Sequence, residues 1–175
     1  MLWTDEHAAN LKKYLETRTL PQWLGDKESA CSIAAINLAI NGKLTDDIPD
    51  CMSVVLGEAI IRLQDAIPGD MRNSDRYRAM LQRAPGTGRD KEKERLEVLT
   101  DWMWGTVLPQ VQPYADENSF GDEWRKMCEE RTLEAHKAAY AAAHEAAYAA
   151  RSAAHGADFW QTVDTIGVLE RMIEV

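Results

Sequence analysis

Basic side chains gather in one segment of an otherwise acidic chain. Residues 72–95 hold eight basic residues against four acidic ones, while the whole chain has a formal net charge of −9. Guanidinium groups bind phosphate or carboxylate through paired hydrogen bonds, so an arginine cluster can hold an anionic ligand such as a nucleotide. The candidate binding residues are Arg72, Arg76, Arg78, Arg83 and Arg89. The alternative is a solvated basic face whose charges pair with acidic neighbours.

A second candidate surface lies in the alanine-rich part of the chain, where eleven of the seventeen residues 138–154 are alanine. With about 100° of rotation per residue, an α-helix would bring seven polar side chains into a stripe about 120° wide. These are His136, Lys137, Tyr140, His144, Tyr148, Arg151 and His155. Such groups can stack on or hydrogen-bond a ligand or a protein partner. The alternative is a polar face that keeps a low-complexity helix soluble.

No pattern for catalysis accompanies these two surfaces. The sequence lacks the motifs of a nucleophile elbow, a zinc protease, a phosphate-binding loop and a dinucleotide-binding turn. His136 and His144 would lie roughly 12 Å apart along a straight helix, too far to share one metal ion. We therefore expect no catalytic residue, no metal and no cofactor, and a protein that is not an enzyme.

Charge and cysteine content restrict the class of protein further. The net charge of −9 argues against direct nucleic-acid binding and suits a basic partner, although it also serves solubility. Cys31, Cys51 and Cys128 have neither disulfide-framework nor zinc-site spacing, which indicates a reducing compartment. The acidic start of the chain does not look like a secretory signal, and no apolar run is long enough to span a bilayer. We expect a cytoplasmic protein that does not bind membranes.

The fold class expected from the sequence is all-α, with residues 1–175 forming a single-domain bundle of about six to seven helices. Thr4 should cap a first helix that runs to Thr17. Residues 28–67 should form a buried helical hairpin, with Gly42 as a left-handed cap and Pro49 opening the second helix. Trp23, in the turn before this hairpin, is most simply a core residue.

Further helices are expected in the second half of the chain. Ser74 should cap a short helix, and a longer one from about residue 89 should carry a stripe formed by Leu96, Leu99 and Met103. Trp102 and Trp104 lie about 200° apart on that helix, so one should be packed and the other nearer the surface.

The C-terminal part should consist of two helices. Alanine content predicts one long helix over residues 122–155. A final helix capped by Asp158 should bury its apolar face, which consists of Val163, Ile166, Leu169, Met172 and Ile173.

Four stretches carry a resemblance to a known type of protein. They are ACSIAAINLA at 30–39, GKLTDDIPDCMS at 42–53, WMWGTVLP at 102–109 and GDEWR at 121–125. With the alanine tract, they resemble uncharacterised small acidic helical proteins encoded by bacteriophages and prophages. The resemblance brings no catalytic motif. It implies that the protein occupies and inhibits a host protein, in particular a component of antiviral defence.

Three functional hypotheses remain open at this point. The leading one is a non-enzymatic interaction protein that binds a host macromolecule through its acidic surface or its alanine-rich helix. The second is a small-molecule binding module, in which the arginine cluster and the His/Tyr stripe meet around an anionic ligand. The third is an assembly protein that forms homo-oligomers through close contact between alanine faces.

Overall fold

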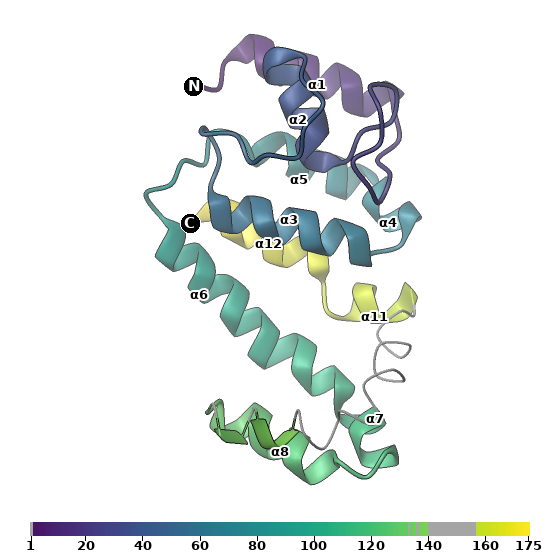
Figure 1. Cartoon of the computed structure of the whole chain (residues 1–175), viewed down its shortest axis with the longest axis vertical. Helices are drawn as coiled ribbons and strands as arrows, with labels where there is room; N and C mark the ends of the chain where they lie inside the picture. Colours follow the sequence, from purple (N-terminus) through teal and green to yellow (C-terminus); the bar gives the residue numbers. More distant parts are fainter. Residues whose placement is uncertain (1, 133, 136, 140–156) are drawn as a thin grey trace. The chain divides into compact units, whose positions relative to one another are not determined.

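The computed structural model describes residues 2–132, 134–135, 137–139 and 157–175, and all regular elements among them are helices (Figure 1). The all-α fold class is thereby confirmed, although the described helices are more numerous and shorter than the six or seven expected. The chain divides into two compact units, Met1–Val98 with Thr165–Val175 (unit 1) and Leu99–Asp164 (unit 2). The single domain expected over 1–175 stays a prediction. None of the described helices is long and apolar enough to cross a membrane.

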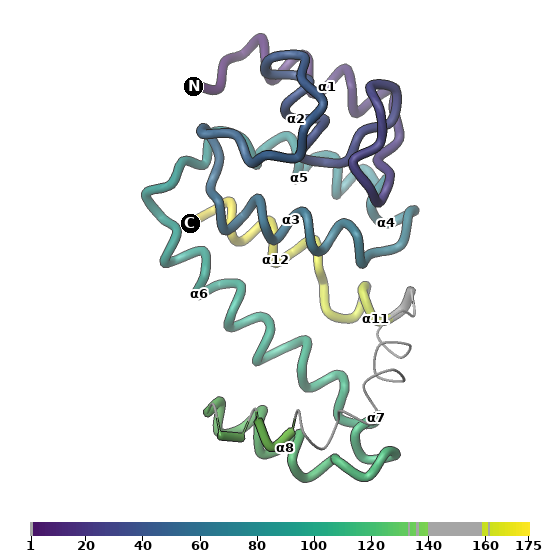
Figure 2. The backbone as a smooth tube through the Cα atoms, viewed as in Figure 1, coloured from purple at the N-terminus to yellow at the C-terminus, as the bar shows by residue number. Residues whose placement is uncertain are grey.

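Unit 1 is built around one almost completely buried helix. Its helices are α1 (Asp5–Thr17), α2 (Ser32–Asn41), α3 (Val54–Ala66), α4 (Gly69–Arg72), α5 (Asp75–Arg83), the first part of α6 (Glu92–Trp102) and α12 (Thr165–Glu174). The α2 helix packs between α1 and α3, and α12 returns from the end of the chain to lie against α3 and α5 (Figures 1 and 2). The buried hairpin expected over 28–67 corresponds to α2 and α3.

Local capping explains where these helices begin and end. Thr4 accepts a hydrogen bond from the amide of His7, Ser74 accepts one from Tyr77, and Gly42 ends α2 with φ of 71°, as expected. The prediction that Pro49 opens the second hairpin helix is wrong. The α3 helix begins at Val54, because the Ser53 hydroxyl caps it by accepting from the Leu56 amide.

A carboxylate from a distant part of the chain completes the start of α3. Glu92 accepts hydrogen bonds from the Ser53 hydroxyl at 2.7 Å, the Val54 amide at 2.7 Å and the Val55 amide at 3.0 Å. Desolvation raises the pKa of Glu92, but these three hydrogen bonds and the positive charge of Arg95 outweigh it, and the pKa lies below its ordinary value. Glu92 therefore fixes the start of α6 to the positive end of α3.

The C-terminal helix is held by a second buried polar side chain. Arg95 is only 2% exposed, and its guanidinium donates to the carbonyl oxygens of Met172, Gly88 and Thr87.

Most of the apolar face expected for the end of the chain is confirmed, and its buried members are Val163, Ile166, Leu169 and Met172. Two helices, α11 (Ala157–Thr162) and α12, replace the single final helix that was expected.

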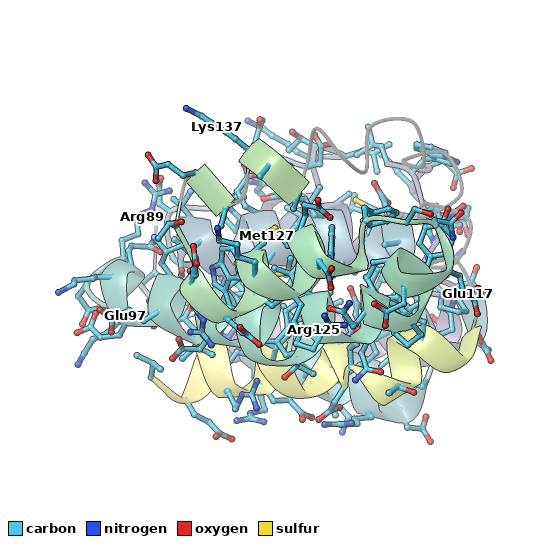
Figure 3. All side chains as sticks on the ribbon, turned by 90° about the horizontal axis from the view of Figure 1, so that it is seen from below. Arg89, Glu97, Glu117, Arg125, Met127 and Lys137 are labelled. Carbon is cyan, nitrogen blue, oxygen red and sulfur yellow. The ribbon has the colours of Figure 1, made fainter. Side chains whose placement is uncertain are left out.

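Unit 2 contains the remainder of α6, η1 (Met103–Val107), η2 (Leu108–Val111), α7 (Gln112–Glu117), α8 (Gly121–Glu130) and α11. Its two tryptophans on α6 and η1 behave as expected, since Trp102 is 3% exposed and Trp104 is half-buried. The Trp102 indole donates to the Val163 carbonyl at 2.6 Å. On α8, Met127 is buried while Arg125 is half exposed, as their separation around the helix requires (Figure 3).

Pro109 explains the wide helical turn of η1. Its ring has no N–H and would clash with the Gly105 carbonyl in a regular α-helix. The chain instead forms a π-helical turn, in which the Leu108 amide donates to the Met103 carbonyl.

The apolar stripe predicted along the helix from about residue 89 is wrong, because Leu96 on α6 is 52% exposed and Met103 on η1 is 36% exposed.

The long helix expected over 122–155 is also wrong at its start. The α8 helix ends at Glu130, because Arg131 adopts a left-handed conformation with φ of 53°. Thr132 then accepts a hydrogen bond from the Ala135 amide at 3.2 Å, in the manner of an N-cap for a new helical turn. This local hydrogen bond overrides alanine propensity. Residues 140–156 lie outside the part that the structure describes.

The Glu92 contact predicts an acid-sensitive contribution to stability. Replacing Glu92 by Gln should lower the free energy of unfolding at neutral pH by about 1 to 2 kcal/mol, because the charged acceptor is lost. Since folding lowers the pKa, the wild-type advantage is complete above the unfolded-state pKa of Glu92. It should disappear as the pH falls through the folded-state pKa.

Urea unfolding of both proteins across the acid range measures this difference, with Glu94→Gln as a matched control. A stability gap that does not change with pH would contradict the assignment.

Candidate functional site

The arginines of the predicted anion-binding cluster make separate intramolecular contacts. Arg72 is 6% exposed and donates to three backbone carbonyls, those of Leu20, Gln64 and Ile67. Arg78 donates to the backbone and side chain of Asn73. Because these two side chains satisfy backbone and amide oxygens nearby, they stabilise the fold where they lie.

The other three arginines of that cluster pair with carboxylates. Arg76 contacts Glu170 of α12 at 2.6 Å, and Arg83 contacts Glu174 of the same helix at 3.3 Å. Arg89 contacts Asp50 at 3.4 Å. The five predicted residues are therefore not brought together around one ligand position. Their contacts match the alternative interpretation, a basic face paired with acidic neighbours.

The second predicted surface, the His/Tyr stripe of the alanine-rich segment, lies almost entirely outside the described residues. His136, Tyr140, His144, Tyr148, Arg151 and His155 lie outside the described residues. Lys137 is described and exposed. The meeting of the two basic regions around one ligand stays a prediction.

Two buried groups, Cys31 and Tyr77, are held in their protonated forms, which disfavours nucleophilic chemistry at these positions. Burial raises the pKa of the Cys31 thiol, which lies at the N-terminus of α2. Tyr77 is completely buried, its pKa is strongly raised by that burial, and its hydroxyl lies 3.0 Å from that of Ser32. Within the described residues, no group of three or more His, Cys, Asp or Glu side chains could hold a metal ion.

An exposed tryptophan is the most unusual surface feature of unit 1. The Trp23 side chain is 75% exposed and the adjacent Leu24 is 38% exposed. The prediction of Trp23 as a core residue is therefore wrong. The apolar anchors of this segment are its neighbours Leu20, Ala30 and Cys31, which are 1%, 0% and 3% exposed. Residues 18–31 are called the Trp23 loop below.

The Trp23 loop is attached firmly to the helices next to it. Three residues before the tryptophan, the Leu20 amide donates to the Asn73 side chain at 2.8 Å, and the Leu20 carbonyl accepts from Arg72 at 2.9 Å. Immediately before the tryptophan, the Gln22 side chain donates to the Asp65 carbonyl at 2.9 Å. These contacts fix the chain up to the residue that precedes Trp23.

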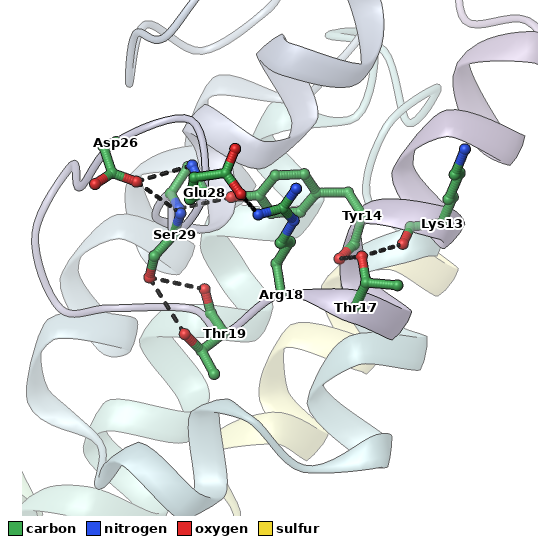
Figure 4. Close-up of polar contacts among 9 residues, drawn as sticks. Lys13, Tyr14, Thr17, Arg18, Thr19, Asp26, Glu28 and Ser29 are labelled. Carbon is green, nitrogen blue, oxygen red and sulfur yellow. Dashed lines mark hydrogen bonds and ion pairs between the residues drawn. The ribbon is translucent and has the colours of Figure 1, made fainter.

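A second set of hydrogen bonds fixes the chain after the tryptophan (Figure 4). Asp26 accepts from the amides of Glu28 and Ser29, and the Asp26 amide donates to the Ser29 carbonyl. The Ala30 amide donates to the Tyr14 hydroxyl at 2.7 Å, which ties the loop to α1. Arg18 and Glu28 form an ion pair across the loop. Trp23 is thus displayed on backbone that is held on both sides.

Glycine is required at one position of this loop. Gly25 has φ of +74°, and a β-carbon there would overlap the carbonyl oxygen of Ser29. The short antiparallel bridge between Gly25 and Ala30 needs this close approach. The loop can therefore close on itself one residue after Leu24.

Charged side chains in and beside the loop include several carboxylates. Asp26 is exposed, and the partly buried Asp65 lies next to Gln22. Burial raises the pKa of Asp65; the charge of Asp46 raises it as well, while Gln64 and Arg72 lower it. Asp46 is itself exposed. Around Trp23 the exposed side chains therefore include the apolar Leu24, the carboxylates of Asp26 and Asp46, and one exposed cation of the loop, Lys27.

Sequence reasoning missed this site because hydrophobicity alone predicted burial of Trp23. The available signals were the turn residues Pro21 and Gly25 on either side of it and the Asp26 side chain that organises the turn. A large apolar residue between such turn residues has few neighbours to pack against. No protein-family model matches the chain, and neither a curated protein nor a solved structure matches it.

The exposure of Trp23 predicts that it contributes little to folding. Trp23→Ala should change the free energy of unfolding by less than about 0.5 kcal/mol, as for other surface substitutions. Trp102→Ala, at a buried tryptophan, should cost about 3 to 5 kcal/mol. Urea denaturation monitored by circular dichroism compares the two variants. A large loss for Trp23→Ala would show that its side chain is packed.

Gly25 predicts a specific loss of order in the Trp23 loop. Gly25→Ala should destabilise the protein by about 1 to 3 kcal/mol, because strain at positive φ adds to overlap with the Ser29 carbonyl. Gly42 has a similar φ of +71° but nothing within 4 Å of its added β-carbon, so Gly42→Ala should cost less. The Asp26 amide donates to the Ser29 carbonyl and the Cys31 amide to the Leu24 carbonyl, so hydrogen exchange of both amides should accelerate only in the Gly25 variant. Equal costs at both glycines would contradict the close approach.

Proposed function

We propose that this is a non-enzymatic interaction protein, of the kind encoded by bacteriophages, that binds and inhibits a host protein such as a component of antiviral defence. The observation that carries the proposal is the exposed Trp23 on a loop held by hydrogen bonds on both sides. Tryptophan is enriched among the residues that dominate protein–protein binding energy. A monomer gains no stability from exposing it.

The rigidity of the loop supports a binding role. Association costs free energy when loops and side chains become ordered at the interface. The Trp23 loop already has its backbone fixed by Asp26, Tyr14 and Arg72. A partner would therefore meet an anchor that is close to its bound conformation.

Charge supports the choice of a protein with a basic surface as the partner. The chain has a formal net charge of −9, and opposite charges accelerate and orient association. The same charge opposes binding to phosphate backbones and anionic membranes. The arginines that would counter this are paired with carboxylates or with backbone oxygens.

The experiment that tests the proposal is a pull-down from bacterial lysate with the purified protein. Bound proteins and extracted small molecules are both identified by mass spectrometry. A host protein recovered in stoichiometric amount, and inhibited by the purified chain, would support the proposal. A bound nucleotide without any protein would favour the small-molecule binding alternative, and recovery of the chain alone would contradict both.

Electrostatic attraction predicts salt-sensitive binding. The affinity for the recovered host protein should fall about tenfold when the ionic strength is raised from low to several times physiological, mainly through slower association. Surface plasmon resonance across a salt series measures both rate constants. Association that does not change with salt would contradict the electrostatic part of the proposal.

A further inference from the structure

We propose that the Trp23 loop is the docking site for a protein surface that offers an apolar pocket bordered by lysine and arginine side chains. The inference rests on the proposed function, and it adds the anchor residues and the chemistry of the partner. The indole of Trp23 fills the pocket, and Leu24 covers its edge.

The shape of the loop indicates an inserted anchor. Trp23 lies two residues before the bridge between Gly25 and Ala30 that closes the loop, and it is 75% exposed. A side chain displayed in this way can be surrounded by a concave partner. Complete burial of an indole in a pocket is the arrangement in which tryptophan contributes most to binding.

The charges around the anchor determine what should border the pocket. The carboxylates of Asp26 and Asp46 are exposed and that of Asp65 is partly exposed; because Arg18 is already paired with Glu28, Lys27 is the exposed cation of the loop that remains beside these three acidic groups. Basic side chains of a partner can approach these carboxylates while the indole enters the pocket. Lysine and arginine can also lie against the indole face, which adds a cation–π interaction.

The same charges argue against the other occupants of an exposed tryptophan. A second copy of the chain would bring carboxylates against carboxylates in a symmetric contact. Anionic lipid and nucleic-acid phosphate would be repelled by Asp26 and Asp46. A basic protein surface is the occupant that both the apolar centre and the acidic edge fit.

A displayed random-peptide library tests the inference without knowledge of the natural partner. The folded full-length protein selects binders, and peptides that also bind the Trp23→Ala variant are removed. The remaining peptides should combine an aromatic or aliphatic cluster with lysine or arginine. For synthetic copies, Trp23→Ala should weaken binding at least tenfold, and Trp23→Phe should weaken it less.

Two further variants separate the anchor from the acidic edge. Asp46→Asn removes an exposed carboxylate and should weaken binding severalfold, with a reduced dependence on salt. Leu96→Ala removes a different exposed apolar side chain, which is 52% exposed on α6, and should leave binding unchanged. Circular dichroism confirms that each variant is folded before its affinity is measured.

Several results would overturn the inference. These are a library that yields no Trp23-dependent peptide, Trp23-dependent peptides without excess basic residues, and loss of binding in Leu96→Ala equal to that in Trp23→Ala. Trp23-dependent self-association in light scattering, or Trp23-dependent binding to lipid vesicles or to a single-stranded oligonucleotide, would overturn it in favour of those occupants.

The proposed function can fail separately from this inference. If the lysate provides a host partner that binds Trp23→Ala as well as wild type, the docking site is wrong while the interaction protein stands. If the peptides behave as expected but no lysate protein is recovered, the docking chemistry stands and the proposed host target fails.

Discussion

The buried guanidinium of Arg72 holds together the elements on which the exposed tryptophan depends. It donates to the Leu20 carbonyl in the Trp23 loop at 2.9 Å and to the Gln64 and Ile67 carbonyls at the end of α3 at 2.6 and 3.0 Å. Moving a charge out of water is costly unless its hydrogen-bonding capacity is satisfied. Three carbonyl oxygens, with the charge of Asp65 nearby, offset that cost, so the loop and α3 are fixed to one another.

Two buried arginines have equivalent roles in unit 1. Arg72 fixes the Trp23 loop, and Arg95 fixes the end of α12 through the Met172 carbonyl. Both cations bind backbone oxygens, and Arg76 and Arg83 pair with carboxylates of α12. The basic segment is therefore largely used inside the fold. Acidic side chains remain at the surface around Trp23, and this distribution of charge determines which partners can approach.

The sequence predicted the elements whose formation is local. Thr4, Ser74 and Gly42 act as caps because capping depends on a few adjacent residues, and the buried α2 follows from its apolar composition. The sequence did not predict features that depend on distant contacts. Arginine spacing alone could not show that Arg72 binds the Leu20 carbonyl, and hydrophobicity alone could not show that Trp23 is exposed. The helix break at Arg131 was missed because alanine propensity was weighed above the Thr132 cap.

The most direct test of the account is site-specific photocrosslinking in bacterial cells. A photoreactive phenylalanine analogue replaces Trp23 in one strain and Leu96 in another, and crosslinked peptides are identified by mass spectrometry. The account predicts one dominant host protein captured from position 23, at a site flanked by lysine or arginine, and none from position 96. Capture of the same proteins from both positions, or of none from position 23, would contradict it.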